Sequence, residues 1–282
     1  MILVDNNQIV FANIFQMVKH NRVDNIDLLR HLILNTYRMY KSKFGNQYGE
    51  LVICHDSGNV WRKEHFPHYK ASRRVAQKES DMDWDVIYDM TSQLRREFRD
   101  TFPYKNLKVD CSEADDIIAV ITKHYHQQEK ILILSGDKDF QQLQVYPNVH
   151  QYAPTKKSFL KCDNPKQFLL DHIIKGDSSD GIPNILSDDD TFVIDDKRQK
   201  PCGKKKIEAI RTTYLEGELF DHNLQRNWER NETLVDLTRI PETLEDKILE
   251  EYNKEPVGSR SKIYNYCVEN NLGKLLPNIE DF

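Results

Sequence analysis

The sequence predicts an α/β fold, in which a mostly parallel central sheet is flanked by helices and followed by a smaller helical domain. Apolar runs that are too short for a helix indicate buried strands, and segments with helical spacing separate them through the first part of the chain. The pattern changes from about Phe168, after which helix-like segments predominate. We therefore expect an α/β domain over residues 1–170 and a helical domain over residues 171–282.

The composition is that of a globular protein rather than a disordered or membrane-spanning one. The chain has 282 residues, of which 39% are hydrophobic and 30% charged; its mean hydropathy is −0.70. No run of about 18 apolar residues could span a membrane, and the first residues lack the basic start and apolar core of a signal peptide. We therefore expect a soluble protein of the cytoplasm. The five cysteines form no Cys-x-x-Cys pair, which argues against both a disulfide framework and a zinc site.

Three of the predicted strands are followed directly by acidic residues. Open α/β sheets bind their ligands beyond the carboxyl ends of the strands, so these acids would face one site. The formal net charge of −5 does not exclude nucleic acid, because a metal-loaded pocket no longer presents bare negative charge. The strands and their acids are Ile2–Val4 with Asp5, Leu51–Cys54 with Asp56, and Ile131–Leu134 with Asp137 and Asp139.

Other segments complete the predicted sheet and its helices. Leu107–Val109 is expected to form a further strand, and two short strands around Pro154, Val149–Tyr152 and Ser158–Lys161, should pair as a hairpin at the sheet edge. Amphipathic spacing predicts helices over 26–44, Trp84–Phe98, Asn231–Leu237, Leu244–Tyr252 and Lys262–Leu276.

The acids at 113–116 have two competing explanations. Ser112 is expected to cap a helix, with Asp115 at the capping-box position. Acids in a first helical turn are favoured by the helix dipole without any further function. In a regular helix Glu113 and Asp115 would point about 200° apart, so they could share a metal only if the helix start is irregular. The residues alone leave this choice open.

Two further pairs of acids come later in the chain. Asp137 and Asp139 alternate in a segment expected to be extended, so they would point the same way and repel each other without a cation. The surrounding residues lack the third acid, central glycine and closing Glu of an EF-hand. Asp177 and Asp180 lie in a Gly- and Ser-rich turn, where capping the next helix is slightly favoured over binding a metal.

Two segments carry concentrated positive charge. Residues 61–78 contain six Lys or Arg against one acid, with Trp61, Phe66 and Tyr69 between them. Basic side chains attract phosphates and aromatic faces stack on unpaired bases, although a solvated loop leading into a helix is the alternative. Further along, Gly203 precedes three lysines, 204–206, at a helix start, an arrangement that suits a backbone phosphate. Residues 187–201, just before this glycine, are expected to form an exposed loop.

The predicted chemistry is hydrolysis of a phosphodiester assisted by metal ions. Oxygen ligands suit hard cations such as Mg²⁺ or Mn²⁺, and two such ions about 4 Å apart can activate water and stabilise a leaving oxygen. No Ser-His-Asp or Cys-His motif competes with the acids. A phosphatase with Asp5 as nucleophile is disfavoured, because such enzymes need an acid two residues later, where this chain has Asn7.

Four segments in this order resemble the flap endonuclease and 5′-nuclease superfamily. They are EADD at 113–116, SGDKDFQQL at 135–143, KGDSSDGIP at 175–183 and WRKEHFPHYKASR at 61–73. The resemblance covers nearly the whole chain and is closest to the T-even-type phage ribonuclease H branch. One departure is Ser-Asp-Gly-Ile-Pro-Asn at 179–184, where the family has Ser-Asp-Asn-Ile-Pro-Gly.

The resemblance implies a 5′-to-3′ nuclease that uses two Mg²⁺ ions, with Mn²⁺ as a substitute. Its substrates would be RNA–DNA hybrids, flaps and nicked duplex DNA, and its task the removal of RNA primers and adjacent DNA in phage lagging-strand replication in the host cytoplasm. Asp137 would be catalytic. The residues that would surround the ions are Asp5, Asp56, Glu113, Asp115, Asp116, Asp137, Asp139, Asp177 and Asp180.

The resemblance also assigns the nucleic-acid contacts. Residues 61–80 match a basic arch that engages 5′ ends, within which Lys70 and Arg73 would steady the scissile phosphate. Residues 175–210 are similar to a helix-hairpin-helix element that grips duplex DNA. A monomer that cooperates with a single-stranded-DNA-binding protein is implied. The residues expected to contact nucleic acid are Arg62, Lys63, Tyr69, Lys70, Arg73, Lys204, Lys205 and Lys206.

Overall fold

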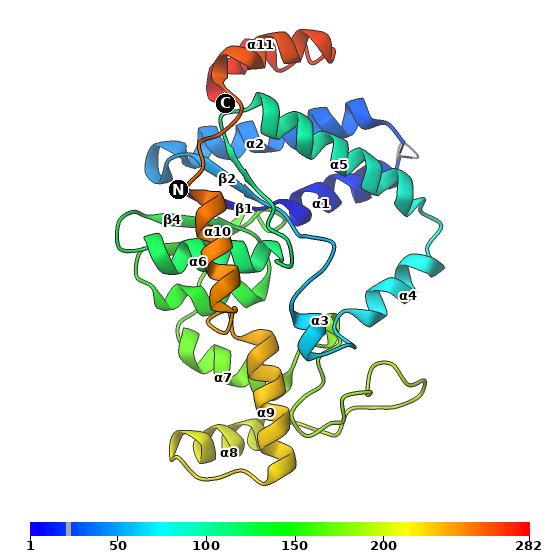
Figure 1. Cartoon of the computed structure of the whole chain (residues 1–282), viewed down its shortest axis with the longest axis vertical. Coiled ribbons are helices and arrows are strands. Elements are labelled where there is room, and N and C mark those ends of the chain that lie inside the picture. The colour runs from blue at the N-terminus through cyan, green and yellow to red at the C-terminus, as the bar shows by residue number, and fades with distance from the viewer. Residues whose placement is uncertain (21–23) are drawn as a thin grey trace.

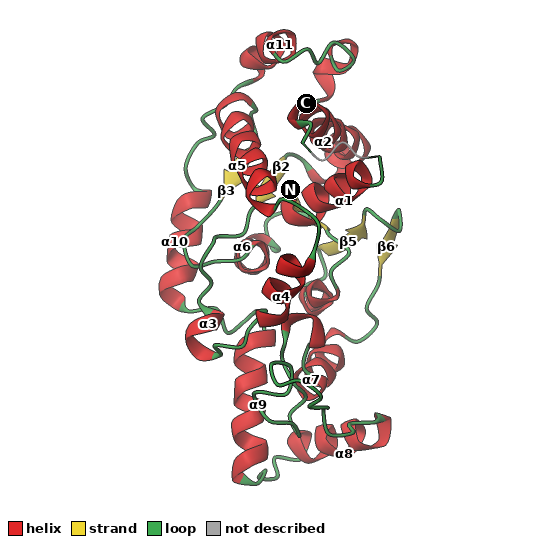
Figure 2. Cartoon of the chain, turned by 90° about the vertical axis from the view of Figure 1, so that its right-hand side faces the viewer, coloured by secondary structure: helices red, strands yellow, loops and turns green. Residues whose placement is uncertain are grey.

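The computed structural model describes residues 1–20 and 24–282, and its centre is a six-stranded sheet (Figures 1 and 2). The strand order is β3-β2-β1-β4-β5-β6, and only the β5–β6 pair is antiparallel. The predicted α/β fold class is therefore confirmed, as is the hairpin at the sheet edge. The strands are β1 (Ile2–Asp5), β2 (Leu51–Cys54), β3 (Lys105–Leu107), β4 (Ile131–Leu134), β5 (Val149–Ala153) and β6 (Ser158–Leu160).

Both faces of the sheet are covered, which explains why its central strands are continuously apolar. Successive side chains of a strand point to opposite faces, so Ile2 and Val4 enter one core cluster while Leu3 enters the other. The first cluster lies under α1 (Asn6–Val18), α2 (Ile26–Tyr48), α5 (Trp84–Thr101) and α11 (Arg260–Glu269). The second lies under α6 (Ala114–Tyr125) and α10 (Glu242–Tyr252).

A third cluster joins helices that lie beyond the sheet, at the lower end of Figure 1. It packs side chains of α7 (Pro165–Lys175), α8 (Lys204–Leu215) and α9 (His222–Val235) around Phe66 and Trp228. The chain then returns to the sheet, because Leu244 and Ile263 belong to the two sheet clusters. The helices that stand apart from the sheet are thus those between about 165 and 235, and the expected boundary near residue 170 stays a prediction.

Several predicted boundaries were wrong, and one helix was missed. The third strand lies two residues earlier than expected, and the predicted helix 231–237 is only the end of α9. The predicted helix 262–276 ends at Glu269, and the short helix Leu276–Asp281 follows separately. Helix α1 was missed because Asn6, Asn7 and Gln8 make its first turn polar. Among the described residues, none of the helices has the length and apolar character needed to cross a membrane.

Two short helices, α3 (Arg62–His65) and α4 (Ala71–Glu79), form the basic segment that links β2 to α5. Figure 1 shows α4 leading away from α3 toward the edge of the molecule before the chain turns back into α5. The residues before α4, Arg62, Tyr69 and Lys70, are the ones that contact an acid near the carboxyl ends of the strands, Glu113.

Candidate metal and nucleic-acid site

Acidic residues from three neighbouring strands gather at the carboxyl edge of the sheet. Asp5 is the last residue of β1, Asp56 follows β2 by two residues, and Asp137 follows β4 by three. Because β2, β1 and β4 are adjacent and parallel, their ends lie together. Asp115, from the first turn of α6, joins them, since Asp5 and Asp137 both act on its charge. We call Asp5, Asp56, Asp115 and Asp137 the central carboxylates.

The central carboxylates are incompletely compensated by positive charge. Burial, together with Asp56 and Asp137, raises the pKa of Asp5 to about 6. Burial also raises the pKa of Asp115 well above its usual range, and Asp5 and Asp137 add to the effect. The pKa of Asp137 is raised by desolvation and by Asp139, and that of Asp56 by desolvation. Burial is the largest cause in each case, and Lys70 offsets only part of the effect at Asp56 and Asp115, so the charged forms are incompletely compensated.

The basic side chains nearby pair with other acids. Glu113 Oε2 accepts hydrogen bonds from Arg62 Nη1 and Tyr69 Oη, both at 2.9 Å, and Oε1 accepts one from Lys70 Nζ at 2.5 Å. Burial opposes its ionisation, yet Lys70 and Arg62 hold the pKa of Glu113 below its usual range. Glu113 is therefore charged, and both of its oxygens have hydrogen-bond partners on basic or hydroxyl side chains, unlike the central carboxylates.

Arg62, which was expected to contact nucleic acid, lies in the interior. Only 2% of the residue is exposed, and its Nε donates to the carbonyl of Leu234 at 2.9 Å. Its Nη2 lies 2.8 Å from Asp116 Oδ1, while Trp61 Nε1 donates to Asp116 Oδ2 at 3.2 Å. The acid Asp116, expected among the metal ligands, is thus enclosed by protein partners.

The start of α6 differs by one residue from the prediction. Glu113, not Ser112, is the N-cap, and Asp116 occupies the capping-box position, accepting from the Glu113 backbone N–H at 2.9 Å. The irregular start left open by the sequence is present, because Glu113 has extended backbone angles. The side chains of Glu113 and Asp115 are therefore not forced to point in opposite directions, as they would be within a regular helix.

The segment after β4 is a 3₁₀ helix, Lys138–Val145, and not the extended segment that was expected. Asp137 caps it, accepting from the Asp139 N–H at 3.0 Å. One of the two Asp137 oxygens therefore serves as a helix cap. Asp139 turns instead toward His172 of α7, with Oδ1 and Nε2 2.9 Å apart. Sequence reasoning missed His172, although its place in the last turn before Gly176-Asp177 was a usable signal.

The acidic turn at 177–180 faces the same site. Asp177 caps the 3₁₀ turn Ser178–Asp180, as the slightly favoured alternative predicted, through a 2.8 Å bond from the Ser179 N–H. Its other oxygen lies 3.0 Å from Lys138 Nζ. Asp180 accepts from Tyr69 Oη at 3.2 Å and pairs with Arg73. In this turn Asp177 therefore caps the 3₁₀ helix while Asp180 contacts the basic residues beside the site.

The arch is fixed to this turn by a close backbone contact. Lys70 adopts a left-handed conformation, with φ of 56°, and its N–H donates to the Asp180 carbonyl at 2.7 Å. Gly181 has φ of 73°, and a Cβ there would lie 3.1 Å from the His68 carbonyl oxygen. The glycine at this departure from the family pattern thus meets a local requirement.

The remaining residues that were predicted to contact nucleic acid differ in exposure and in location. Lys63 is in α3 and half-buried, Tyr69 is buried, and Arg73 is exposed on α4. Lys204, Lys205 and Lys206 are exposed in the first turn of α8, which Gly203 precedes as predicted. Figure 1 shows α8 at the far end of the molecule from the sheet. These three lysines are therefore not part of the acidic site.

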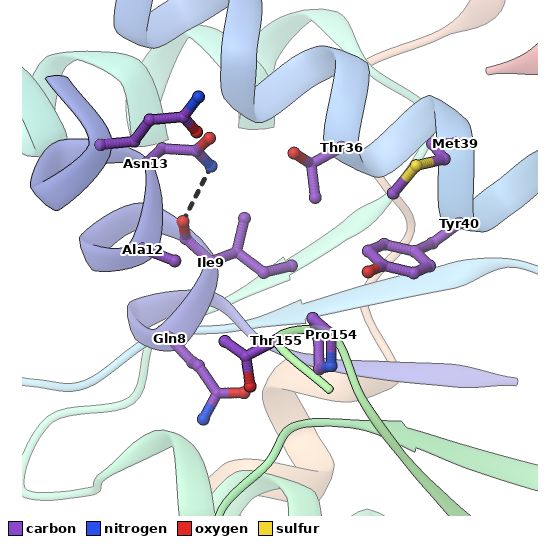
Figure 3. A pocket seen from close by; sticks show the side chains of 10 residues that line it. Gln8, Ile9, Ala12, Asn13, Thr36, Met39, Tyr40, Pro154 and Thr155 are labelled. Carbon is purple, nitrogen blue, oxygen red and sulfur yellow. Dashed lines mark hydrogen bonds between the residues drawn. The ribbon is translucent and has the colours of Figure 1, made fainter. Parts of the chain in front are cut away.

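An open pocket of about 190 Å³ adjoins the site between α1, α2 and the turn after β5 (Figure 3). Gln8 lines it and accepts the Gly136 N–H at 2.6 Å, which connects the pocket wall to the segment before Asp137. Ile9, Tyr40 and Pro154 form part of the remaining wall. The residues that line the pocket carry no charge. Any metal binding therefore depends on the carboxylates beside the pocket.

The donor set fits divalent metal ions. It offers carboxylate oxygens, which hard cations prefer, and their raised pKa values show that a positive charge would stabilise them. Asp139, His172 and Asp177 form a second group whose donor atoms all lie within 4.8 Å of one another.

Two family models match the chain. "5′-3′ exonuclease, N-terminal resolvase-like domain" matches residues 1–169, and "T4 RNase H, C terminal" matches residues 165–282. Ribonuclease H of Enterobacteria phage T4 is 31% identical over 289 aligned positions, which cover 99% of this chain and 95% of the relative. A 5′-3′ exonuclease of Buchnera aphidicola is 26% identical, with 55% of this chain and 52% of the relative covered.

Solved structures share the fold. The protein resembles a flap endonuclease of bacteriophage T5, solved in a pseudo-enzyme-product complex with DNA and metal ions, with a TM-score of 0.64 at 19% identity over 90% of this chain and 99% of the other. A second T5 structure, co-crystallised with metal ions, gives a TM-score of 0.64 at 18% identity over 89% and 98% of the two chains.

Replacing Arg62 with Met should lower the free energy of unfolding by about 3–5 kcal/mol, because Glu113 and Asp116 would keep buried charges without their partner. Urea unfolding measures this change. Arg73→Met is the matched control: the Arg73 side chain is 53% exposed, so it should cost at most about 1 kcal/mol. An equal decrease in the free energy of unfolding in the two variants would contradict the structural role of Arg62.

Without metal, ionisation of Asp5 should cost the protein stability as the pH rises from about 4 to about 6. The folded pKa of Asp5, about 6, exceeds its ordinary value of 3.8, so the folded state binds more protons across this window. Asp5→Asn should flatten the decline and stabilise the metal-free protein at pH 7 by up to about 3 kcal/mol. Thermal unfolding in a chelator checks both effects, and a less stable variant at pH 7 would refute them.

Proposed function

The chain belongs to the 5′-3′ exonuclease family and is a nuclease, and we propose that it removes RNA primers from RNA–DNA hybrids together with adjacent DNA. In this proposal it works from 5′ ends, also cleaves flaps and nicked duplex DNA, and depends on two Mg²⁺ ions. The observation that carries the proposal is the group of incompletely compensated central carboxylates beside a basic arch. Bound divalent ions supply activation of water and stabilisation of the leaving oxygen in such a site.

The ions would be held by the central carboxylates together with Asp139 and Asp177, while Glu113 and Asp180, which already pair with Arg62, Lys70 and Arg73, would line the site around them. Asp116 takes a different part in this proposal: with Arg62 it orients Glu113, since its oxygens already face Trp61, Arg62 and a backbone N–H. This revises the assignment of Asp116 as a metal ligand and of Arg62 as a nucleic-acid contact.

Lys70 and Arg73 would bind the scissile phosphate. Burial disfavours the charged form of Lys70, but Tyr69, Asp180 and Glu113 hold its pKa well above the usual value, so it stays charged. Its Nζ lies between Glu113 and Asp180, at 2.5 and 3.5 Å. Arg73 is more exposed and can reach a phosphate that enters from solvent. Tyr69 then positions Glu113 and Asp180 through its hydroxyl.

A duplex would extend from this site toward the far end of the molecule. There Gly203 and Lys204–Lys206 present backbone N–H groups and positive charge at the start of α8, which suits a phosphate of the backbone. The complex of the T5 flap endonuclease with DNA supports a DNA substrate for this fold. A place in phage lagging-strand replication, as a monomer assisted by a single-stranded-DNA-binding protein, completes the proposal.

Asp137→Asn should reduce cleavage of an RNA primer annealed to DNA by roughly 10²–10⁴-fold, because several kcal/mol of metal-assisted stabilisation would be lost. Asn keeps an oxygen that can cap the 3₁₀ helix, so folding and duplex binding should persist. Asp163→Asn, at a side chain that is 87% exposed, is the matched control and should cleave normally. Mg²⁺-dependent cleavage that survives Asp137→Asn unchanged would overturn the assignment.

A bulky group on the 5′ end should suppress cleavage if the chain works from free 5′ ends. The test compares blocked and unblocked substrates of the same sequence, as an RNA–DNA hybrid, a flap and a nicked duplex. We expect short 5′-phosphorylated products only from the free ends. Equal cleavage of blocked and free substrates would show internal cutting instead.

A further inference from the structure

His172 lies beside two acids, but its Nε2 makes no hydrogen bond to either of them. It lies in the last turn of α7 and is only 5% exposed. Its Nε2 is 2.9 Å from Asp139 Oδ1 and 3.8 Å from Asp177 Oδ2. Nε2 and Asp139 Oδ1 are nevertheless both buried without a hydrogen-bond partner. They face each other closely, but not in the direction that a hydrogen bond requires.

Two buried polar atoms left in this state cost free energy. A cation between them removes the cost, because an imidazole nitrogen and a carboxylate oxygen can both donate to it. Asp177 Oδ2 provides a third donor, and the three donor atoms lie within 4.8 Å of one another. The arrangement therefore has the composition of a mixed nitrogen and oxygen metal site.

The three side chains are supported by regular structure. Phe168, one turn earlier on α7, stacks on the His172 ring with centroids 5.7 Å apart and an interplanar angle of 25°. Asp139 stands in the first turn of the 3₁₀ helix, and Asp177 is held by its capping bond to Ser179. Lys138 Nζ, 3.0 Å from Asp177 Oδ2, belongs to a side chain that is 48% exposed and can move away when an ion binds.

We propose that His172 supplies a nitrogen ligand to an ion held by Asp139 and Asp177, and that it makes this position prefer Mn²⁺ or Co²⁺ to Mg²⁺. The reason is chemical: imidazole suits first-row transition metals, whereas Mg²⁺ favours oxygen ligands. The inference deepens the proposed function and rests on it, since Asp139 and Asp177 belong to both. The two ions are then unlike: one sits among the all-oxygen central carboxylates, and the other is held partly by nitrogen.

Pulsed electron paramagnetic resonance of Mn²⁺ bound to the full chain tests this directly. A histidine ligand modulates the electron spin echo through its nitrogen, and labelling histidine with ¹⁵N changes the modulation without altering the sequence. We expect a nitrogen signal that responds to the label in the native protein. It should disappear in His172→Gln and persist in the matched control His150→Gln, which replaces an exposed histidine on β5.

Calorimetric titration of the same proteins measures the preference. His172→Gln should weaken binding of one Mn²⁺ by at least about 10–100-fold, the loss typical of removing even an outer-shell partner of a metal ligand, and change Mg²⁺ affinity by less than about three-fold. Two bound Mn²⁺ without a nitrogen signal in the native protein would overturn the inference and leave the proposed function standing. Failure of the native protein to bind Mn²⁺ or Mg²⁺ at all would overturn both.

Discussion

The repulsion among acids that the parallel sheet brings to one edge is the constraint on which the rest of the site depends. Strands β2, β1 and β4 end side by side, so Asp5, Asp56 and Asp137 converge as a consequence of topology. Asp115 adds a fourth carboxylate from α6. Burial removes the water that would screen these charges, and their raised pKa values follow. A divalent cation relieves this repulsion, which links the fold to the chemistry of a nuclease.

The protein satisfies some acids itself and leaves others for ligands. Glu113 and Asp116 share the buried Arg62, and Asp180 pairs with the arch through Lys70 and Arg73. These contacts also fix the arch, because Lys70 is bonded through its backbone to the acidic turn. Arg62 and Tyr69 are therefore part of the site's framework, whereas Lys70 and Arg73, at the start of α4, are the side chains proposed to bind phosphate. Charge compensation thus separates positioning residues from those that would bind metal or substrate.

The sequence was sufficient to predict the sheet and to identify most of the acids of the site, because both depend on patterns in neighbouring residues. Apolar runs marked β1, β2 and β4, and acids followed each of them. The sequence could not show that Arg62 points inward, because burial of a charged side chain is set by partners 51 and 172 positions away. It also could not distinguish an extended segment from the 3₁₀ helix that Asp137 caps. His172 was missed because its role depends on a contact between α7 and the segment after β4.

Proton release on metal binding tests the central claim most directly. Titrating Mg²⁺ calorimetrically at pH 6 in buffers of different ionisation enthalpy gives the number of protons expelled per protein. If the central carboxylates hold protons because they lack a cation, about one proton or more should leave as Mg²⁺ binds. Binding without any proton release would contradict the account, because it would mean that these carboxylates are already fully charged in the metal-free protein.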